Sequence, residues 1–168
     1  MMKPVYKKDG FTFYEYTPSI TKPFFINMEP LTIKRRIRFL LAYFYGYKVF
    51  YLKENDEFIG YCVVQNGKDK RYSFSTDKDI LVGPYFIHEN HRGRKLSIFL
   101  LDYILKKSDV KFENAYDYIH KDNIPSIKAS EAVGFKYFSD ANLTKYTRSI
   151  KLCDSGKGEY VILKYSNK

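Results

Sequence analysis

Apolar and polar positions follow two periods along the chain, and the changes of period outline its secondary structure. Aromatic and polar residues alternate from 11 to 16, which is the period of two expected for a half-buried strand. Residues 47–53 and 57–65 are two β-rich runs joined by a Glu-Asn-Asp segment, so they predict a hairpin. Further strands are predicted at 115–120, 135–146 and 159–165.

The apolar run from 80 to 88 differs from the others because Gly83 and Pro84 interrupt it. A proline cannot donate a hydrogen bond to a neighbouring strand. The interruption therefore predicts a bulge, a sheet edge, or a place where two strands part.

Two other segments carry apolar residues at clear helical spacing. The stripe Leu96, Phe99, Leu100, Tyr103 and Ile104 predicts a long helix that ends in the segment 106–109. Residues 125–133 predict a short helix with Asn123 near its cap and Gly134 at its end.

The segment 31–45 is predicted to form a basic amphipathic helix. Its apolar positions are Ile33, Ile37, Leu40, Leu41 and Phe44, with Lys34, Arg35 and Arg38 on the other side. Such a helix can touch a membrane or nucleic acid. We expect instead that it packs its apolar face on the protein and leaves its charges in solvent.

Together the elements predict a mixed α/β protein with at least one β-α-β unit. The chain has 168 residues, a hydrophobic fraction of 45% and a charged fraction of 29%. It shows no internal repeat and no linker rich in Pro, Gly or Ser, so we expect one domain over residues 1–168.

The location and redox state follow from what the sequence lacks. The first residues lack the apolar run of a secretory signal, and no apolar stretch reaches the ~20 residues of a membrane span. Cys62 and Cys153 are far apart and predict free thiols in a reducing cytoplasm. Nothing in the spacing of His88, His91 and His120 demands a metal, and we expect none.

A net charge of +10 favours an anionic partner, such as nucleic acid, a membrane surface or a polyphosphate ligand. The basic residues are mostly Lys and are scattered along the chain. A generally basic surface is the simplest interpretation, and charge alone does not decide the function.

The chemistry concentrates in residues 80–97, where a strand runs into a loop and the loop opens a helix. The loop contains Arg92, Gly93, Arg94 and Lys95. A helix N-terminus binds phosphate through unpaired N–H groups, and cationic side chains strengthen that binding. The loop matches neither of the two common glycine-rich nucleotide motifs. It is either a phosphate-binding turn or a solvated basic loop.

Together with a second motif, these residues resemble the GNAT acetyltransferases. That family binds the CoA pyrophosphate on a loop of Arg or Gln, two variable residues, Gly, one variable residue, and Gly or Ala. The aligned residues here are 92–97. About thirty residues later the family has an Asn, a short helix and a Gly-Phe pair, matched by Asn123, residues 124–133 and Gly134-Phe135. The hairpin at 56–64 also looks like the second and third GNAT strands.

The resemblance implies a GNAT-like acyl-CoA N-acyltransferase fold, an α/β (α+β) mixed sheet that is centrally splayed and flanked by helices. It implies that acetyl-CoA is the acetyl donor. By the same resemblance the CoA-binding residues are Tyr85, Phe86, Ile87, Arg92, Gly93, Arg94, Lys95, Leu96, Ser97, Asn123, Ser126 and Ser130. Two positions depart from the family: Lys95 stands where it usually has Gly, and Ser97 where it has Gly or Ala.

In the implied mechanism the strands at 80–88 and 115–120 part, and the pantetheine arm lies between them. Backbone groups of Tyr85 and Ile87 would pair with the pantetheine amides. An N–H in the segment 85–87 would donate to the thioester carbonyl as an oxyanion-hole donor. A primary amine then attacks directly in a ternary complex.

The base and the acid depart from the family's usual pattern. The positions matching its usual Glu or His are Leu81 and Gly83, and neither can take a proton. His120 is the expected substitute base and His88 the second choice, although a lone His is more often structural. Asp79 is on the same face of the strand but lies near its start.

The family's helix Tyr, which protonates the leaving thiolate, aligns with Ser130. Ser130 either hydrogen-bonds the sulfur or is merely a small residue facing the cofactor, and the substitute acids considered are Tyr137 and Tyr146.

Three functions remain open. The leading one is N-acetyltransfer to a primary amine on a small molecule or a glycan, with an anionic acceptor favoured by the basic surface. The second is a catalytically weak protein that binds CoA. The third is a basic nucleic-acid-binding module, for which the sequence offers charge and aromatic residues but no recognised motif.

Overall fold

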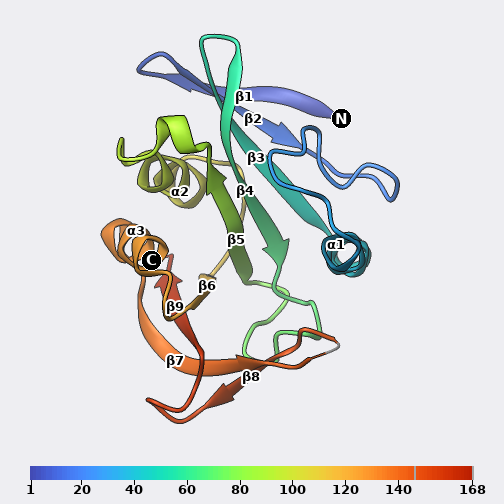
Figure 1. Ribbon diagram of the computed structural model, residues 1–168, viewed down its shortest axis with the longest axis vertical. Helices are drawn as coiled ribbons and strands as arrows, with labels where there is room; N and C mark the ends of the chain where they lie inside the picture. The colour runs from blue at the N-terminus through green and yellow to red at the C-terminus, as the bar shows by residue number, and fades with distance from the viewer. Residues whose placement is uncertain (146, 168) are drawn as a thin grey trace.

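The computed structural model describes residues 1–145 and 147–167 and contains one nine-stranded sheet with helices on both faces (Figure 1). The strands are β1 (Met2–Lys8), β2 (Phe11–Tyr16), β3 (Tyr47–Glu54), β4 (Glu57–Asn66), β5 (Ile80–Ile87), β6 (Asn114–His120), β7 (Lys136–Leu143), β8 (Ile150–Cys153) and β9 (Tyr160–Ser166). The helices are α1 (Ile33–Tyr45), α2 (Leu96–Lys106) and α3 (Ile124–Val133), with a 3-10 turn η1 (Glu89–His91).

The sheet runs in the order β1-β2-β3-β4-β5-β6-β9-β7-β8. Its neighbouring strands pair antiparallel, except for β5 and β6, which are parallel and are joined through α2. The predicted β-α-β unit and the predicted hairpin, β3 and β4, are thus confirmed.

Two strands escaped prediction, and both lie at an edge of the sheet. β1 contains Pro4 and several lysines, and its pairing with β2 shifts register between Pro4 and Tyr6. β8 is a short strand that pairs with β7. Edge strands bury little surface, so their sequences lack the strict alternation by which β2 was recognised. The strand predicted at 135–146 ends at Leu143, and Tyr146 lies outside the described residues.

α2 and α3 cover one face of the sheet, and α1 lies against the other (Figure 1). The predicted stripe of α2 is confirmed, because Leu96, Leu100, Tyr103 and Ile104 are buried in the larger core cluster. Burying one such apolar side chain contributes about 1.5–3 kcal/mol. This packing fixes the start of α2 beside the end of β5.

The expected orientation of α1 is wrong. The residues assigned to its packed face are exposed, namely Ile33, Ile37, Leu40, Leu41 and Phe44. The side facing the protein carries Phe39 and Ala42, which are buried, together with the half-buried Arg35 and Arg38. The spacing of these four inner residues is itself helical, so a second stripe was present in the sequence.

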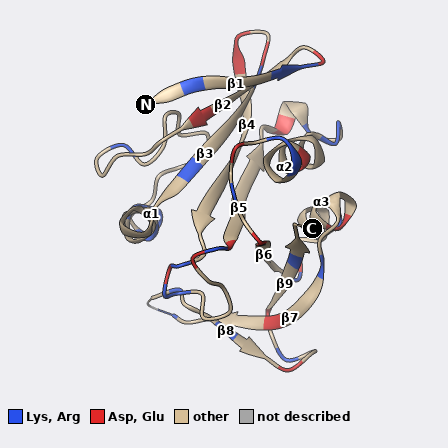
Figure 2. Cartoon of the chain, turned by 180° about the vertical axis from the view of Figure 1, so that it is seen from behind, with Lys and Arg blue, Asp and Glu red and all other residues tan. Residues whose placement is uncertain are grey.

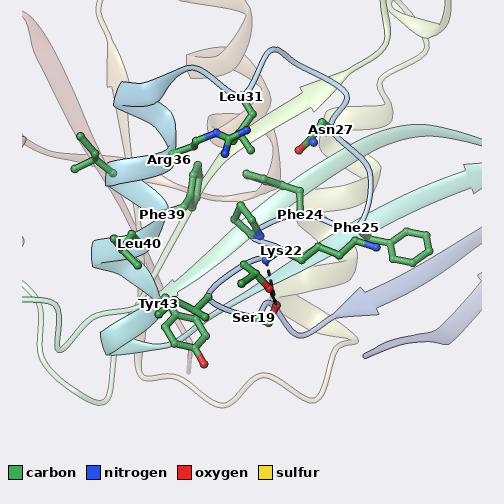
Figure 3. A pocket seen from close by; sticks show the side chains of 14 residues that line it. Ser19, Lys22, Phe24, Phe25, Asn27, Leu31, Arg36, Phe39, Leu40 and Tyr43 are labelled. Carbon is green, nitrogen blue, oxygen red and sulfur yellow. Dashed lines mark hydrogen bonds between the residues drawn. The ribbon is translucent and has the colours of Figure 1, made fainter.

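The reason for this orientation is that the surface under α1 offers polar partners. The guanidinium of Arg35 donates to the hydroxyl of Tyr61 and pairs with Glu29 at 3.1 Å. This guanidinium also lies over the ring of Phe24. Phe24 in turn meets Phe39 edge-on, with the two ring centroids 4.7 Å apart (Figure 3). The hydroxyl of Tyr61 also donates to Glu29, and an arginine neutralises the charge of that carboxylate, which a leucine would leave without a cation.

A shallow pocket of about 360 Å³ lies between α1 and the loop at 19–27, where Leu40, Tyr43 and Phe25 reach its rim (Figure 3). Lys and Arg residues are spread over strands, loops and helices rather than gathered on one element (Figure 2). None of the helices within residues 1–145 and 147–167 is long and apolar enough to cross a membrane.

Candidate active site

The two parallel strands at the centre of the sheet part after their first residues. β5 and β6 pair only at Ile80–Ala115 and Leu81–Tyr116. On the other side of β5, the pairing with β4 shifts register around Gly83 and Pro84. The predicted parting of these strands at the Gly-Pro interruption is therefore present, and it leaves one backbone edge of β5 without a strand partner. We call this opening the fork.

Gly83 lies at the fork in a backbone conformation that favours glycine, next to a carboxylate. It has a φ of +105°, which favours glycine, and its carbonyl accepts a hydrogen bond from Gln65 Nε2 at 3.1 Å. A Cβ at this position would be in ordinary contact with Asp117 Oδ1, at 3.4 Å. The positive φ is therefore what requires a glycine here, and Asp117 lies beside it at the point where the strands part.

A pocket of about 600 Å³ lies on the side of the fork formed by α2 and α3. We call it the donor pocket. All of the predicted CoA-binding residues except Arg94 and Ser130 line it: Tyr85, Phe86, Ile87, Arg92, Gly93, Lys95, Leu96, Ser97, Asn123 and Ser126. The fold therefore gathers two motifs that are separated along the sequence.

The loop before α2 explains what the departure at Lys95 means for the backbone. Gly93 has a φ of +78° and Lys95 a φ of +59°, and Lys95 is the N-cap residue of α2 in the left-handed conformation. The glycine usual at this position adopts that conformation without strain, whereas for a lysine it costs roughly 1 kcal/mol. The loop shape is kept, and a cation is added to the pocket wall. No side chain caps the helix, so its first N–H groups are free of a capping partner.

The two arginines of the loop take different positions. Arg92 lines the donor pocket, and its Nε donates to the carbonyl of Ile87 at 3.1 Å. Arg94 turns away and forms a bidentate pair with Glu54, with N–O distances of 2.8 and 2.7 Å. The guanidinium of Arg94 therefore does not line the pocket, and only its backbone remains close to it.

A second pocket, of about 200 Å³, opens on the other side of the fork. We call it the acceptor pocket. Its walls include Arg38 from α1, Pro84 from β5, Asp117 from β6 and Arg148. Tyr85, Asn123 and Ser126 line this pocket and the donor pocket alike, so the two meet at these residues.

Three polar side chains lie together where the pockets meet: Ser130 and Asp117 are buried, and Tyr85 is half-buried. Ser130, fully buried on α3, donates to Asp117 Oδ2 at 2.6 Å. The hydroxyl of Tyr85 lies 3.3 Å from Ser130 Oγ and donates to the carbonyl of Ser126 at 2.9 Å. The phenol therefore lies beside the hydrogen bond from Ser130 to Asp117. Each hydroxyl already donates its one proton, so a proton can pass between them only after one of these bonds breaks.

Burial raises the pKa of the Asp117 carboxyl and of the Tyr85 hydroxyl. Loss of solvent raises the pKa of Asp117 to about 7, and the hydrogen bond from Ser130 opposes the rise. Burial, and next the charge of Asp117, also raise the pKa of the Tyr85 hydroxyl, so it keeps its proton at neutral pH. A carboxylate that titrates near neutral pH can take up and release a proton.

Asp117 was missed by sequence reasoning, although a signal was present. The strand Ala115–Ile119 alternates, and Ala115 and Ile119 are buried beneath the helices. Asp117 occupies the inward position between them, where an apolar residue is expected. An acid on the buried face of a central strand is a functional candidate on these grounds alone.

The two predicted histidines lie outside the walls of both pockets. His120 is exposed, lies 3.6 Å from Asp122 Oδ2 and packs edge-on against Tyr160. Neither His120 nor His88 lines the donor or the acceptor pocket. Asp79 binds Asn114 and Thr76, which ties β5 to β6 before they part. Tyr137 is exposed and lines neither pocket, and Tyr146 lies outside the described residues.

Comparisons with known proteins agree on the fold. No protein-family model matches the sequence, and no curated protein matches it.

Many solved structures are similar, and three of them illustrate the likeness. A GNAT family acetyltransferase from Elizabethkingia anophelis with acetyl-CoA bound has a TM-score of 0.63 at 13% identity, covering 95% of this chain and 100% of that chain. An acetyltransferase from Thermus thermophilus has a TM-score of 0.58 at 20% identity, covering 83% and 78%. An N-acetyltransferase from Campylobacter jejuni has a TM-score of 0.53 at 17% identity, covering 80% and 79%. The chain therefore has the fold of the GNAT acetyltransferases, as its two motifs predicted.

Proposed function

We propose that this protein transfers the acetyl group of acetyl-CoA to a primary amine. The observation that carries the proposal is the fork between β5 and β6, which has one pocket on each side and shared walls between them. An opening of this kind lets a donor and an acceptor meet in one complex, and proximity then supplies much of the rate. The three similar structures are acetyltransferases, and that from Elizabethkingia anophelis has acetyl-CoA bound.

The donor pocket suits the phosphates and the pantetheine arm of CoA. Arg92 and Lys95 place two cations at the uncapped start of α2, where backbone N–H groups favour an anion. The free edge of β5 offers N–H and C=O groups to an extended amide chain. We assign the CoA contacts to the residues of this pocket, with Arg94 contributing its backbone alone.

Acetyl-CoA supplies an activated thioester carbon when bound. The reaction breaks the C–S bond and forms a C–N bond, so one proton must leave the amine and one must reach the sulfur. A backbone N–H in the segment 85–87 would stabilise negative charge on the carbonyl oxygen. A free amine is mostly protonated at neutral pH, so the ammonium form first loses its extra proton to solvent, and the neutral amine then attacks.

We assign the proton handling to Asp117, Ser130 and Tyr85 in place of His120. The carboxylate of Asp117 lines the acceptor pocket and accepts the proton of the amine. Ser130 connects it to the hydroxyl of Tyr85, which lines both pockets. Tyr85 gives its proton to the sulfur and, once these hydrogen bonds rearrange, recovers one through Ser130 from Asp117, so the three groups return to their starting state.

Two broader assignments follow from the same observations. We propose that residues 1–168 act as one domain, because a single sheet runs through them. We also propose a cytoplasmic location, since Cys62 and Cys153 are free thiols and acetyl-CoA is an intracellular metabolite.

Thermal unfolding with and without acetyl-CoA tests the donor site. Ligand at 100 times its Kd stabilises by about 2.7 kcal/mol, which raises the Tm by roughly 2–4 °C per kcal/mol. We expect this shift in the wild type and a smaller one in Arg92→Gln. Amine-dependent release of the CoA thiol then tests turnover. A thermal shift without release from a broad panel of amines would favour a CoA-binding protein without transfer activity, and no shift would reject the donor site.

A further inference from the structure

Two arginines form the far wall of the acceptor pocket. Arg38 and Arg148 line this pocket, and both also line an adjoining pocket of about 220 Å³. Pro84 borders both spaces as well, so the two form one cleft that leads from the fork to the surface. The two arginines come from α1 and from the segment between β7 and β8, far apart in sequence.

The cleft has an excess of positive charge. Arg35 is neutralised by Glu29, at 3.1 Å, and Asp117 is the buried carboxylate bound by Ser130. Within residues 1–145 and 147–167, neither Arg38 nor Arg148 has a carboxylate within ion-pair distance. Lys34 adds a further cation to the rim. An uncompensated cationic cleft attracts and retains an anion.

Arg38 is held in place before any ligand arrives. Its Nη2 donates to the hydroxyl of Tyr118 at 2.5 Å, and its guanidinium lies over the rings of Tyr118 and Phe39. These contacts fix a flexible side chain, so less entropy is lost when it binds a ligand. They use one edge of the guanidinium, and a planar fork of donors suits the paired oxygens of a carboxylate or phosphate.

We propose that the acceptor is a small amine that also carries a carboxylate or a phosphate, bound by Arg38 and Arg148. The inference rests on the proposed function, because it assigns the amine to the fork and the anionic group to the far wall. The volume of the pocket, about 200 Å³, limits the part of the acceptor between these points to a small molecule. Tyr118 and Tyr160 also line that space.

The test uses matched amines that differ in one anionic group. Tyramine is compared with tyrosine, ethanolamine with phosphoethanolamine, and glucosamine with glucosamine 6-phosphate. We expect kcat/KM to favour the anionic member of at least one pair by about tenfold or more. The first pair reports on a carboxylate and the other two on a phosphate. Arg38→Gln and Arg148→Gln should each remove most of that preference.

Arg36→Gln is the matched control. Arg36 lies on the same helix, is exposed and lines the pocket at 19–27 instead of the cleft. The substitution Arg36→Gln removes the same charge from the protein and should leave the preference for anionic amines unchanged. All three variants should keep the thermal shift with acetyl-CoA, which shows that they are folded and bind the donor.

The outcomes separate the substrate class from the function. If neutral and anionic amines react equally and the arginine variants change nothing, the anionic acceptor is rejected while acetyl transfer stands. If no amine reacts, acetyl transfer is rejected, and binding of phosphoethanolamine or inorganic phosphate decides the site. Stabilisation of the wild type that is lost in Arg38→Gln but kept in Arg36→Gln would support the anion site, and no stabilisation would overturn it.

Discussion

Ser130 Oγ lies 2.6 Å from Asp117 Oδ2 and donates to it, which links the buried side of α3 to the strand β6 at the fork. The resemblance places a tyrosine at position 130, and this chain has a serine there. A phenol is nevertheless close by, because the hydroxyl of Tyr85 approaches Ser130 from β5. In this chain the phenol near this point therefore comes from the strand, and the helix carries a small residue.

Tyr85→Phe should slow acetyl transfer while leaving donor binding intact. The change removes one hydroxyl and keeps the ring, so the packing at the fork is preserved. Proton transfer by a positioned side chain contributes about 10²–10⁴-fold, and we expect a fall in kcat at the lower end of that range. Steady-state kinetics with acetyl-CoA measures it. An acetyl thioester of a more acidic thiol should narrow the defect, and an equal defect with both donors would contradict the role of the phenol.

Asp117→Asn should abolish the rise of kcat with pH around neutrality. Burial raises the pKa of Asp117 to about 7, so the carboxylate is available as a base only above that pH. The wild type should therefore gain activity as pH rises through about 7. The variant keeps an acceptor for Ser130 but has no base, and its kcat should fall by about 10²-fold or more. A pH profile with the same rise in both proteins would assign the base elsewhere.

The same substitution should change how stability depends on pH. The unfolded chain releases the proton of Asp117 near its ordinary pKa of 3.8, whereas the folded protein holds it until about pH 7. The folded state binds more protons in this window, so stability falls as pH rises, by on the order of 1 kcal/mol per pH unit. Urea unfolding at pH 5 and pH 8 should show a smaller difference for Asp117→Asn than for the wild type. An unchanged difference would place the carboxyl in solvent.

Arg92→Gln should weaken CoA binding more than Arg94→Gln. Both substitutions remove one charge from the same loop, but the guanidinium of Arg94 is engaged with Glu54. We expect about a tenfold loss of affinity at Arg92 and a severalfold smaller loss at Arg94. Isothermal titration with CoA compares them. Glu54→Gln should move Arg94 toward the behaviour of a free cation, and equal losses at both arginines would contradict this assignment.

Lys95→Gly and Lys95→Ala separate the charge of this residue from its backbone conformation. Both remove the cation, so CoA affinity should fall in both by about three- to tenfold. Only glycine relieves the strain of the left-handed conformation, which costs roughly 1 kcal/mol. Lys95→Gly should therefore be the more stable of the two by a few tenths to about 1 kcal/mol. If urea unfolding shows Lys95→Ala to be more stable than Lys95→Gly, position 95 is not held at positive φ.

Substitutions on the two sides of α1 should affect the free energy of unfolding in the order opposite to the one that the sequence pattern predicts. Ile37 is 54% exposed and Phe39 is 1% exposed. Ile37→Lys should change the free energy of unfolding by less than about 0.5 kcal/mol. Phe39→Ala should cost about 3–5 kcal/mol, because it empties a buried site. If the two variants lose similar amounts of unfolding free energy, the orientation of α1 described here is contradicted.

The central half of the fold could be predicted from the sequence, because its elements are buried on one or both faces. The stripe of α2 and the break at Gly83-Pro84 each have one structural meaning when the neighbouring strands are known. The loop at 92–97 and the cap at Asn123 were found because their backbone roles restrict the residue types. These features locate the donor pocket.

The remaining features depend on contacts between distant segments. The orientation of α1 is set by Tyr61 and Glu29, which satisfy Arg35, and a helical projection of α1 contains neither. The phenol that faces Ser130 comes from a position expected to contribute only its backbone. His120 was favoured because imidazole titrates near neutral pH, whereas burial gives a carboxylate the same property. Sequence composition does not reveal such burial unless the register of β6 is known.

Because the donor pocket and the acceptor pocket share three lining residues, Tyr85, Asn123 and Ser126, we expect binding in one pocket to change binding in the other. A ligand that moves or orders these residues from the donor side changes the surface that the acceptor meets. By linkage, the factor by which the donor changes the affinity for the acceptor equals the factor by which the acceptor changes the affinity for the donor. An acceptor that raises the affinity for acetyl-CoA would therefore also bind more tightly when acetyl-CoA is present. A substitution in the wall alters both affinities at once, although it touches only one residue.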